Sequence, residues 1–182
     1  MARIPYADPD KAPEPVREAL DRLPPLNIFR MLANAESVFR PYLRFGAALL
    51  TDLDLNGLLR ELAILRVSQL TPNAEYEWVQ HEPIARAVGA SDEQIAALER
   101  GEIGADCFDA VQRATLRFTG EVVVDAHASD ETFAELAALL PPRQIVELLL
   151  VIGQYMMLAR VMTTLELELD EPATPGTIRF NP

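Results

Sequence analysis

The sequence has 182 residues, 49% of them hydrophobic, so the chain is long enough to bury one substantial core. Its formal net charge is -12 and its 16 Lys and Arg residues are scattered, which excludes the basic surface that a nucleic-acid partner requires. The single cysteine, Cys107, excludes an intrachain disulfide and a two-thiol redox cycle.

The first 27 residues form a proline-rich arm, in which we expect one short helix over about 15–23. The start of the chain has no apolar stretch typical of a secretory signal, so we expect a cytoplasmic protein. In 35–50, apolar residues recur at spacings of three and four, which predicts an amphipathic helix. We place the main helical domain at 28–169.

Two neighbouring helices are expected in the middle of the chain. Residues 56–70 are apolar around more than half of the helix circumference, which predicts a buried helix that contains Glu61. Thr71 and Pro72 would supply the N-cap and first-turn proline of a second helix over 74–88. Because the connection is short, the two helices should pack antiparallel and bring Glu61 toward His81.

Four more helices follow. The capping box of Ser91 and Gln94 predicts a helix to about residue 98. Further helices are expected over 108–124, from Ser129 onward and over 143–168, and an irregular tail over 170–182. The apolar run 148–159 is too short for a membrane helix, so we expect it in the core or at a subunit interface.

The segment 71–89 contains the residues best suited to chemistry. Glu77 and His81 are four positions apart and would share a helix face, so the carboxylate is placed to orient or charge the imidazole, as a proton shuttle requires. The same spacing occurs in ordinary surface pairs, and Trp78 between them fits core packing as well as ligand contact. One histidine with neighbouring carboxylates offers too few ligands for zinc, so we expect no metal.

Two longer stretches carry a family resemblance: RELAILRVSQLTPNAEYEWVQHEPIARAVGASDEQIAAL at 60–98 and RQIVELLLVIGQYMMLARV at 143–161. Both resemble the carboxymuconolactone decarboxylase and alkyl hydroperoxidase D superfamily. The resemblance implies an all-α, alkyl hydroperoxidase D-like helical bundle that forms a homo-oligomer, a trimer or hexamer.

Peroxidase members of this superfamily carry Cys-x-x-Cys-x-x-x-His preceded by a relay Glu. With the motif aligned on His81, the relay Glu falls on Glu61 and the two cysteines fall on Ala74 and Glu77. Because both thiols are absent, the peroxidase chemistry cannot be carried over. The chain therefore resembles the cysteine-free, decarboxylase-like branch.

That branch implies a small lactone or organic acid as substrate, protonation of a carbanion or enolate, and neither metal nor organic cofactor. We expect catalytic roles for His81, Glu77 and Glu61, and substrate contacts from Trp78, Arg86, Arg60 and Arg66. The function predicted is a lyase or isomerase type enzyme with a small-molecule substrate and with no nucleic-acid or membrane partner. Two alternatives stay open: a noncatalytic oligomeric binding or scaffold protein, and a peroxidase-like oxidoreductase by family only.

One internal similarity accompanies the resemblance. Residues 58–70 can be laid over 144–156 so that Glu61 coincides with Glu147. The overlap is explained either by a degenerate repeat or by the leucine content of two helices alone. The second copy has no counterpart of His81.

Overall fold

The computed structural model describes residues 1–170, which contain nine α-helices and no β-strand. The predicted all-α fold is confirmed. The predicted irregular tail lies outside the described residues, apart from Asp170. The helices are α1 (Glu14–Leu20), α2 (Asn27–Leu32), α3 (Glu36–Thr51), α4 (Gly57–Leu70), α5 (Glu75–Ala87), α6 (Asp92–Glu99), α7 (Ala110–Asp125), α8 (Asp130–Ala137) and α9 (Pro142–Leu165).

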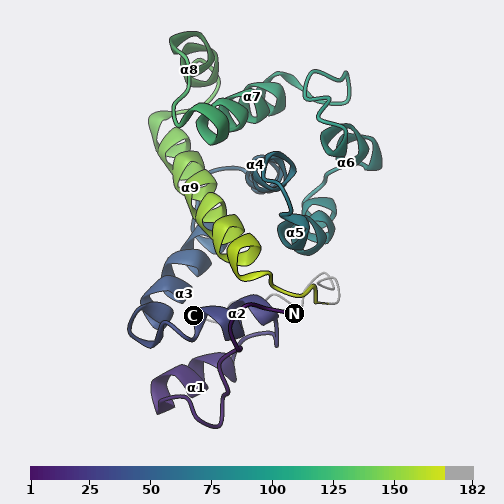
Figure 1. Cartoon of the computed structure of the whole chain (residues 1–182). Coiled ribbons are helices and arrows are strands. Elements are labelled where there is room, and N and C mark those ends of the chain that lie inside the picture. The colour runs from purple at the N-terminus through teal and green to yellow at the C-terminus, as the bar shows by residue number, and fades with distance from the viewer. Residues whose placement is uncertain (171–182) are drawn as a thin grey trace.

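Helix α4 lies at the centre of the bundle and packs against α5, α7 and α9 (Figure 1). It begins cleanly because the Asn56 side chain accepts hydrogen bonds from the backbone N–H groups of Leu58, at 2.8 Å, and Leu59, at 3.4 Å. One face of α4 belongs to the apolar cluster shared with α3 and α9, and the other to the cluster around α6. The buried helix predicted from its all-round apolar pattern is confirmed.

The start of α5 differs from the predicted one. Thr71 is not its N-cap but the C-cap of α4, and the Thr71 hydroxyl donates a hydrogen bond of 2.8 Å to the carbonyl of Val67. The chain then reverses through Asn73, whose φ of 62° lies in the left-handed region that asparagine tolerates. Because the hydroxyl is already used by the last turn of α4, α5 begins only at Glu75.

The predicted capping residues of the next helices are confirmed. Ser91 and Gln94 form a reciprocal capping box at the start of α6, and Ser129 caps α8. A second capping box, which was not predicted, joins Asp109 and Gln112 at the start of α7. The two boxes are joined by a hydrogen bond of 2.9 Å from Gln94 Nε2 to Gln112 Oε1, so the start of α6 is tied to the start of α7.

Helix α9 is the longest helix and runs past α4, α7 and α3 (Figure 1). Within the described part of the chain it alone is long and apolar enough to cross a membrane by length and composition, but half of its most apolar window is buried inside the protein. Core helices pass the same test. An apolar stripe of α9 stays exposed and consists of Val146, Leu149, Leu150 and Met157.

The N-terminal arm, residues 1–27, contains the one short helix predicted for it, α1, and a second helix, α2, begins at its end. Helix α2 was not predicted, yet Ile28, Phe29 and Met31 in it are buried. The arm is held against the segment that follows α9: Arg3 forms an ion pair of 2.7 Å with Glu166, and the Asn27 N–H donates a hydrogen bond of 2.8 Å to Asp170. The arm therefore forms part of the body of the protein next to the end of α9.

Candidate functional site

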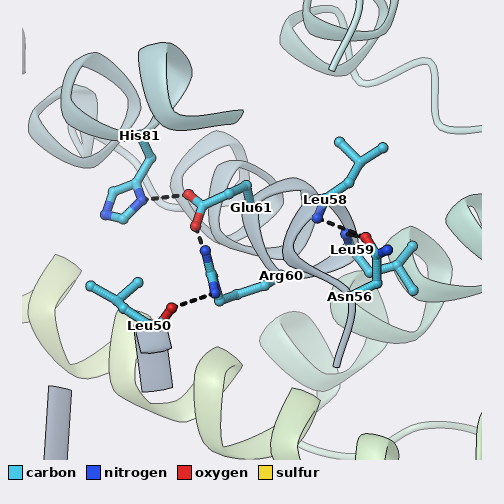
Figure 2. A network of polar contacts seen from close by, with 7 residues as sticks. All are labelled: Leu50, Asn56, Leu58, Leu59, Arg60, Glu61 and His81. Atoms are coloured by element: carbon cyan, nitrogen blue, oxygen red, sulfur yellow. Dashed lines mark hydrogen bonds and ion pairs between the residues drawn. The ribbon is translucent and has the colours of Figure 1, made fainter. Parts of the chain in front are cut away.

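A buried carboxylate on α4 contacts the histidine on α5 (Figure 2). Glu61 Oε2 lies 2.8 Å from His81 Nδ1, although the two residues are 20 positions apart. Glu61 Oε1 accepts a hydrogen bond of 2.8 Å from Arg60 Nε, and Arg60 Nη1 donates one of 2.8 Å to the carbonyl of Leu50. The predicted approach of Glu61 to His81 through packing of these two helices is confirmed.

The charge of Glu61 is stabilised inside the protein. Its side chain is 0% exposed. Burial by itself would raise the pKa of the Glu61 carboxyl, but the attraction and hydrogen bond of His81, together with Arg60, outweigh burial and lower the pKa below its usual value. Glu61 is therefore an ionised, fixed hydrogen-bond acceptor for the His81 imidazole.

His81 sits between this carboxylate and a pocket. Its ring meets the ring of Tyr155 edge to face, with centroids 4.8 Å apart and an interplanar angle of 88°. His81 lines the pocket, and since Nδ1 is engaged by Glu61, Nε2 is the ring nitrogen left for a ligand. A hydrogen bond at one ring nitrogen sets the tautomer of a neutral imidazole, so the contact with Glu61 leaves Nε2 of that tautomer as an acceptor toward the pocket.

Glu77 does not pair with His81, and the predicted Glu77–His81 interaction is wrong. Instead, the Glu61 carboxylate on the neighbouring helix engages His81 Nδ1. Glu77 is 2% exposed, and neither of its carboxylate oxygens has a hydrogen-bond partner among residues 1–170. Burial raises the pKa of the Glu77 carboxyl well above its usual value.

The pocket beside these residues has a volume of about 90 Å³, so it suits a small ligand. Helices α2, α3, α5 and α9 line it, mostly with apolar side chains. Tyr42 and Gln154 face each other across it, and Gln154 Nε2 donates a hydrogen bond of 2.6 Å to the Tyr42 hydroxyl. Among residues 1–170, no Lys or Arg lines the pocket.

The arginines proposed as substrate contacts lie elsewhere. Arg60 lies behind Glu61 and holds it, as described above. Arg66 bonds to Gln69 and lies against Gly120 of α7. Arg86 is partly exposed and pairs with Glu82 and Asp92. Since none of the three reaches the pocket lining, the described residues provide no guanidinium for a substrate carboxylate.

Trp78 and Cys107 also lie outside this pocket. Trp78 packs against the apolar cluster around α6 and borders a separate surface hollow. Cys107 is half-buried against the same cluster, and burial raises the pKa of its thiol, which disfavours the thiolate. No group of three or more His, Cys, Asp and Glu residues that could hold a metal ion is found in residues 1–170.

Several pocket residues were not identified from the sequence. Tyr42, Gln154 and Tyr155 come from α3 and α9, far from the motif around His81 in the chain. Gln154 carried a usable signal, since it is a polar residue that interrupts the longest apolar run. A buried amide in such a helix needs a partner, and here that partner is a pocket tyrosine.

Comparison with protein families finds a match. Residues 36–121, which hold both Glu61 and His81, match the model of the Carboxymuconolactone decarboxylase family. This central segment is therefore similar to the carboxymuconolactone decarboxylase family. Comparison with curated proteins finds no match.

Solved structures share the AhpD-like fold at low sequence identity. An uncharacterized peroxidase-related protein from Ralstonia eutropha JMP134, described as an alkylhydroperoxidase AhpD core, is 20% identical with a TM-score of 0.78 over 93% of this chain and 92% of that chain. A peroxidase-related protein from Silicibacter sp. TM1040 is 20% identical with a TM-score of 0.76 over 92% and 90% of the two chains. The debrominase Bmp8, solved as a variant in complex with 2,3,4-tribromopyrrole, is 18% identical with a TM-score of 0.73 over 93% and 94%.

Proposed function

We propose that the protein is a cofactor-independent enzyme of the lyase or isomerase type, in which His81 moves a proton on a small carbonyl compound such as a lactone or organic acid. The observation that carries this proposal is the 2.8 Å contact between Glu61 and His81 at the wall of a pocket. Histidine is suited to such work because its ordinary pKa lies near neutrality. The role first assigned to Glu77, the orientation of the imidazole, passes to Glu61.

The geometry supports a simple proton cycle. With Nδ1–H donated to Glu61, Nε2 carries a lone pair and can remove a proton from a ligand carbon next to a carbonyl group. The electron pair moves onto the carbonyl oxygen, and the imidazolium formed at His81 is stabilised by the Glu61 charge. In a lyase reaction His81 starts as the imidazolium: loss of CO₂ leaves the electron pair on carbon, and His81 Nε2 donates its proton to that carbon.

Two rival functions are less well supported. A noncatalytic scaffold has no need of a buried, unpartnered Glu77 at a pocket, since such a group lowers stability. A peroxidase needs a thiolate, and Cys107 does not line the pocket. The debrominase structure with a bound halopyrrole supports a small ring compound as the kind of ligand that this fold accommodates.

The test is catalysis by His81. Small lactones and lactone acids are incubated with the protein in D₂O, and ¹H NMR follows both deuterium uptake next to the carbonyl and loss of CO₂. His81→Gln keeps a polar side chain but cannot exchange a proton near neutral pH, so the rate should fall by about 100-fold to 10,000-fold. A rate in His81→Gln above about a tenth of the parent rate would rule out the proton-carrier role.

His127→Gln is the matched control. His127 is the second histidine of the chain, is exposed and lies outside the pocket, so its replacement should leave the rate unchanged. Circular dichroism of both variants should match the parent. An equal loss in the two variants would show that the effect does not arise at the pocket.

A further inference from the structure

The state of Glu77 bears on what the pocket binds. Glu77 lines the pocket and is 2% exposed, and no donor among residues 1–170 reaches either of its carboxylate oxygens. A buried charge without a partner is costly, so the group avoids the cost by keeping its proton. A protonated carboxyl is a hydrogen-bond donor as well as an acceptor.

The charged and titratable groups around Glu77 do not offer it a cation. Tyr42 on α3 and Tyr155 on α9 line the same pocket, and burial raises the pKa of both phenols, so they stay neutral. On α4, Arg60 is engaged by Glu61, and on α5, His81 is engaged by the same carboxylate. The electrostatics of this wall therefore favour an uncharged ligand, because a second anion would meet the Glu61 charge with no free cation in the described lining.

We propose that the pocket takes a small, uncharged, mostly apolar molecule with a carbonyl group, and that the carbonyl oxygen accepts a hydrogen bond from the protonated Glu77 carboxyl. The inference rests on the proposed function in placing the ligand beside His81, and it narrows the substrate from lactones and acids to the uncharged carbonyl class. In this arrangement Glu77 donates a hydrogen bond to the carbonyl oxygen of the ligand, and His81 exchanges a proton with the carbon next to it.

The assignment also gives Glu77 a part in the reaction. When His81 Nε2 removes a proton next to the carbonyl, the electron pair of the broken C–H bond moves onto the carbonyl oxygen. A hydrogen bond from Glu77 strengthens as that oxygen gains charge, which stabilises the enolate. His81 then returns the proton to a different carbon of the conjugated enolate, so the step is an isomerisation that needs no oxidant, reductant or second substrate.

Binding of three probes with one aromatic skeleton tests the ligand class without requiring turnover. Acetophenone has a carbonyl acceptor, ethylbenzene has none, and benzoate carries a negative charge. We expect acetophenone to bind about 2-fold to 12-fold more tightly than ethylbenzene, the value of one neutral hydrogen bond. Benzoate should bind at least about tenfold more weakly than acetophenone, because its charge is buried without a partner. Titrations followed by protein NMR give the three affinities.

Two variants isolate the contribution of Glu77. Glu77→Gln keeps a hydrogen-bond donor without a titrating group, so the preference for acetophenone over ethylbenzene should persist. Glu77→Leu removes the donor at similar size, so that preference should disappear while ethylbenzene still binds. The inference would be overturned if benzoate bound as tightly as acetophenone. It would also be overturned if Glu77→Leu kept the preference for acetophenone over ethylbenzene, or if acetophenone did not bind at millimolar concentration.

A spectroscopic measurement completes the test. Infrared difference spectra of the parent minus Glu77→Gln at pH 7 should contain the carbonyl band of a protonated carboxylic acid. A carboxylate band in its place would overturn the proposed donor. His81→Gln should keep both this band and acetophenone binding while it loses catalysis. A failure of the proposed proton transfer can therefore be told apart from a failure of the proposed ligand class.

Discussion

Glu61 and His81 are held together by the packing of two helices, and not by the side-chain spacing of one. Their contact of 2.8 Å joins α4 to α5 across 20 positions of the chain. Both helices are anchored in the core, so the relative position of carboxylate and imidazole does not depend on the rotamer of an exposed side chain. The orientation of His81 is therefore built into the fold before any ligand binds.

Replacing the carboxylate that holds His81 should impair the reaction. Glu61→Gln removes the charge that stabilises the imidazolium, and we expect a rate loss of at least about tenfold in the deuterium-exchange assay. Glu147→Gln is the control, since Glu147 coincides with Glu61 when residues 58–70 are laid over 144–156 and pairs with Arg143 outside the pocket. Equal activity of Glu61→Gln and the parent would contradict the assigned role.

The buried Glu77 should make stability fall as pH rises. The unfolded chain releases this proton at about pH 4.3, whereas the folded chain holds it to a higher pH, so unfolding becomes easier above about pH 4.3 until the folded group also ionises. Glu77→Gln removes this effect. At pH 7 we expect the melting temperature of Glu77→Gln to exceed that of the parent by several degrees, which corresponds to a gain of about 1 to 3 kcal/mol in the free energy of unfolding. This difference in melting temperature should disappear near pH 4.

Thermal denaturation at several pH values measures this difference. Glu131→Gln is the control, because Glu131 is exposed and its replacement should change the melting temperature little at any pH. A gap that stays constant from pH 4 to pH 7 would mean that Glu77 titrates alike in the folded and unfolded chains.

We propose that a second copy of the chain covers the exposed stripe of α9. Val146, Leu149, Leu150 and Met157 are each at least 40% exposed, and such a continuous apolar face is typical of an interface. Light scattering should therefore give a mass that is a multiple of 20.2 kDa, three or six copies by resemblance to the family. Leu150→Glu should lower that mass.

Val124→Glu is the matched control for the interface. Val124 is 68% exposed at the end of α7 and does not belong to the stripe on α9, so its replacement should leave the mass unchanged. A parent mass of 20.2 kDa at micromolar concentration would exclude the proposed assembly.

The thiol should not support peroxidase turnover. A single cysteine cannot form the internal disulfide that closes a dithiol cycle, and Cys107 is half-buried. Dithiol-dependent consumption of peroxide should be at background in the parent and unchanged in Cys107→Ser. A strong parent activity that disappears in Cys107→Ser would restore the peroxidase hypothesis.

The helices and the approach of α4 to α5 could be predicted because they depend on local patterns. Apolar periodicity locates each long helix, and a short connection makes neighbours pack. Helix α2 was not predicted because six residues show little apolar periodicity, and its burial comes from packing against distant parts of the chain. Its boundaries depend on tertiary contacts that no local pattern encodes.

The candidate site was only partly predictable for the same reason. The motif identifies His81 and Glu77, but spacing on one helix cannot show that a carboxylate from another helix reaches the histidine first. Nor can it show which arginines face the pocket. Arg60 is one position from Glu61 in sequence, yet its guanidinium lies behind that carboxylate and holds it.

The residues that line the pocket come from different parts of the chain. Of the 16 described residues that line it, seven lie outside the segment 36–121, three of them within 26–29 and four on α9. The reactive pair and the shape of the cavity therefore belong to parts of the chain that can change independently during evolution. A relative that keeps Glu61 and His81 but changes the residues at 26–29 and on α9 would keep the proton chemistry and lose the selectivity, so ligand preference among such relatives should follow those two segments.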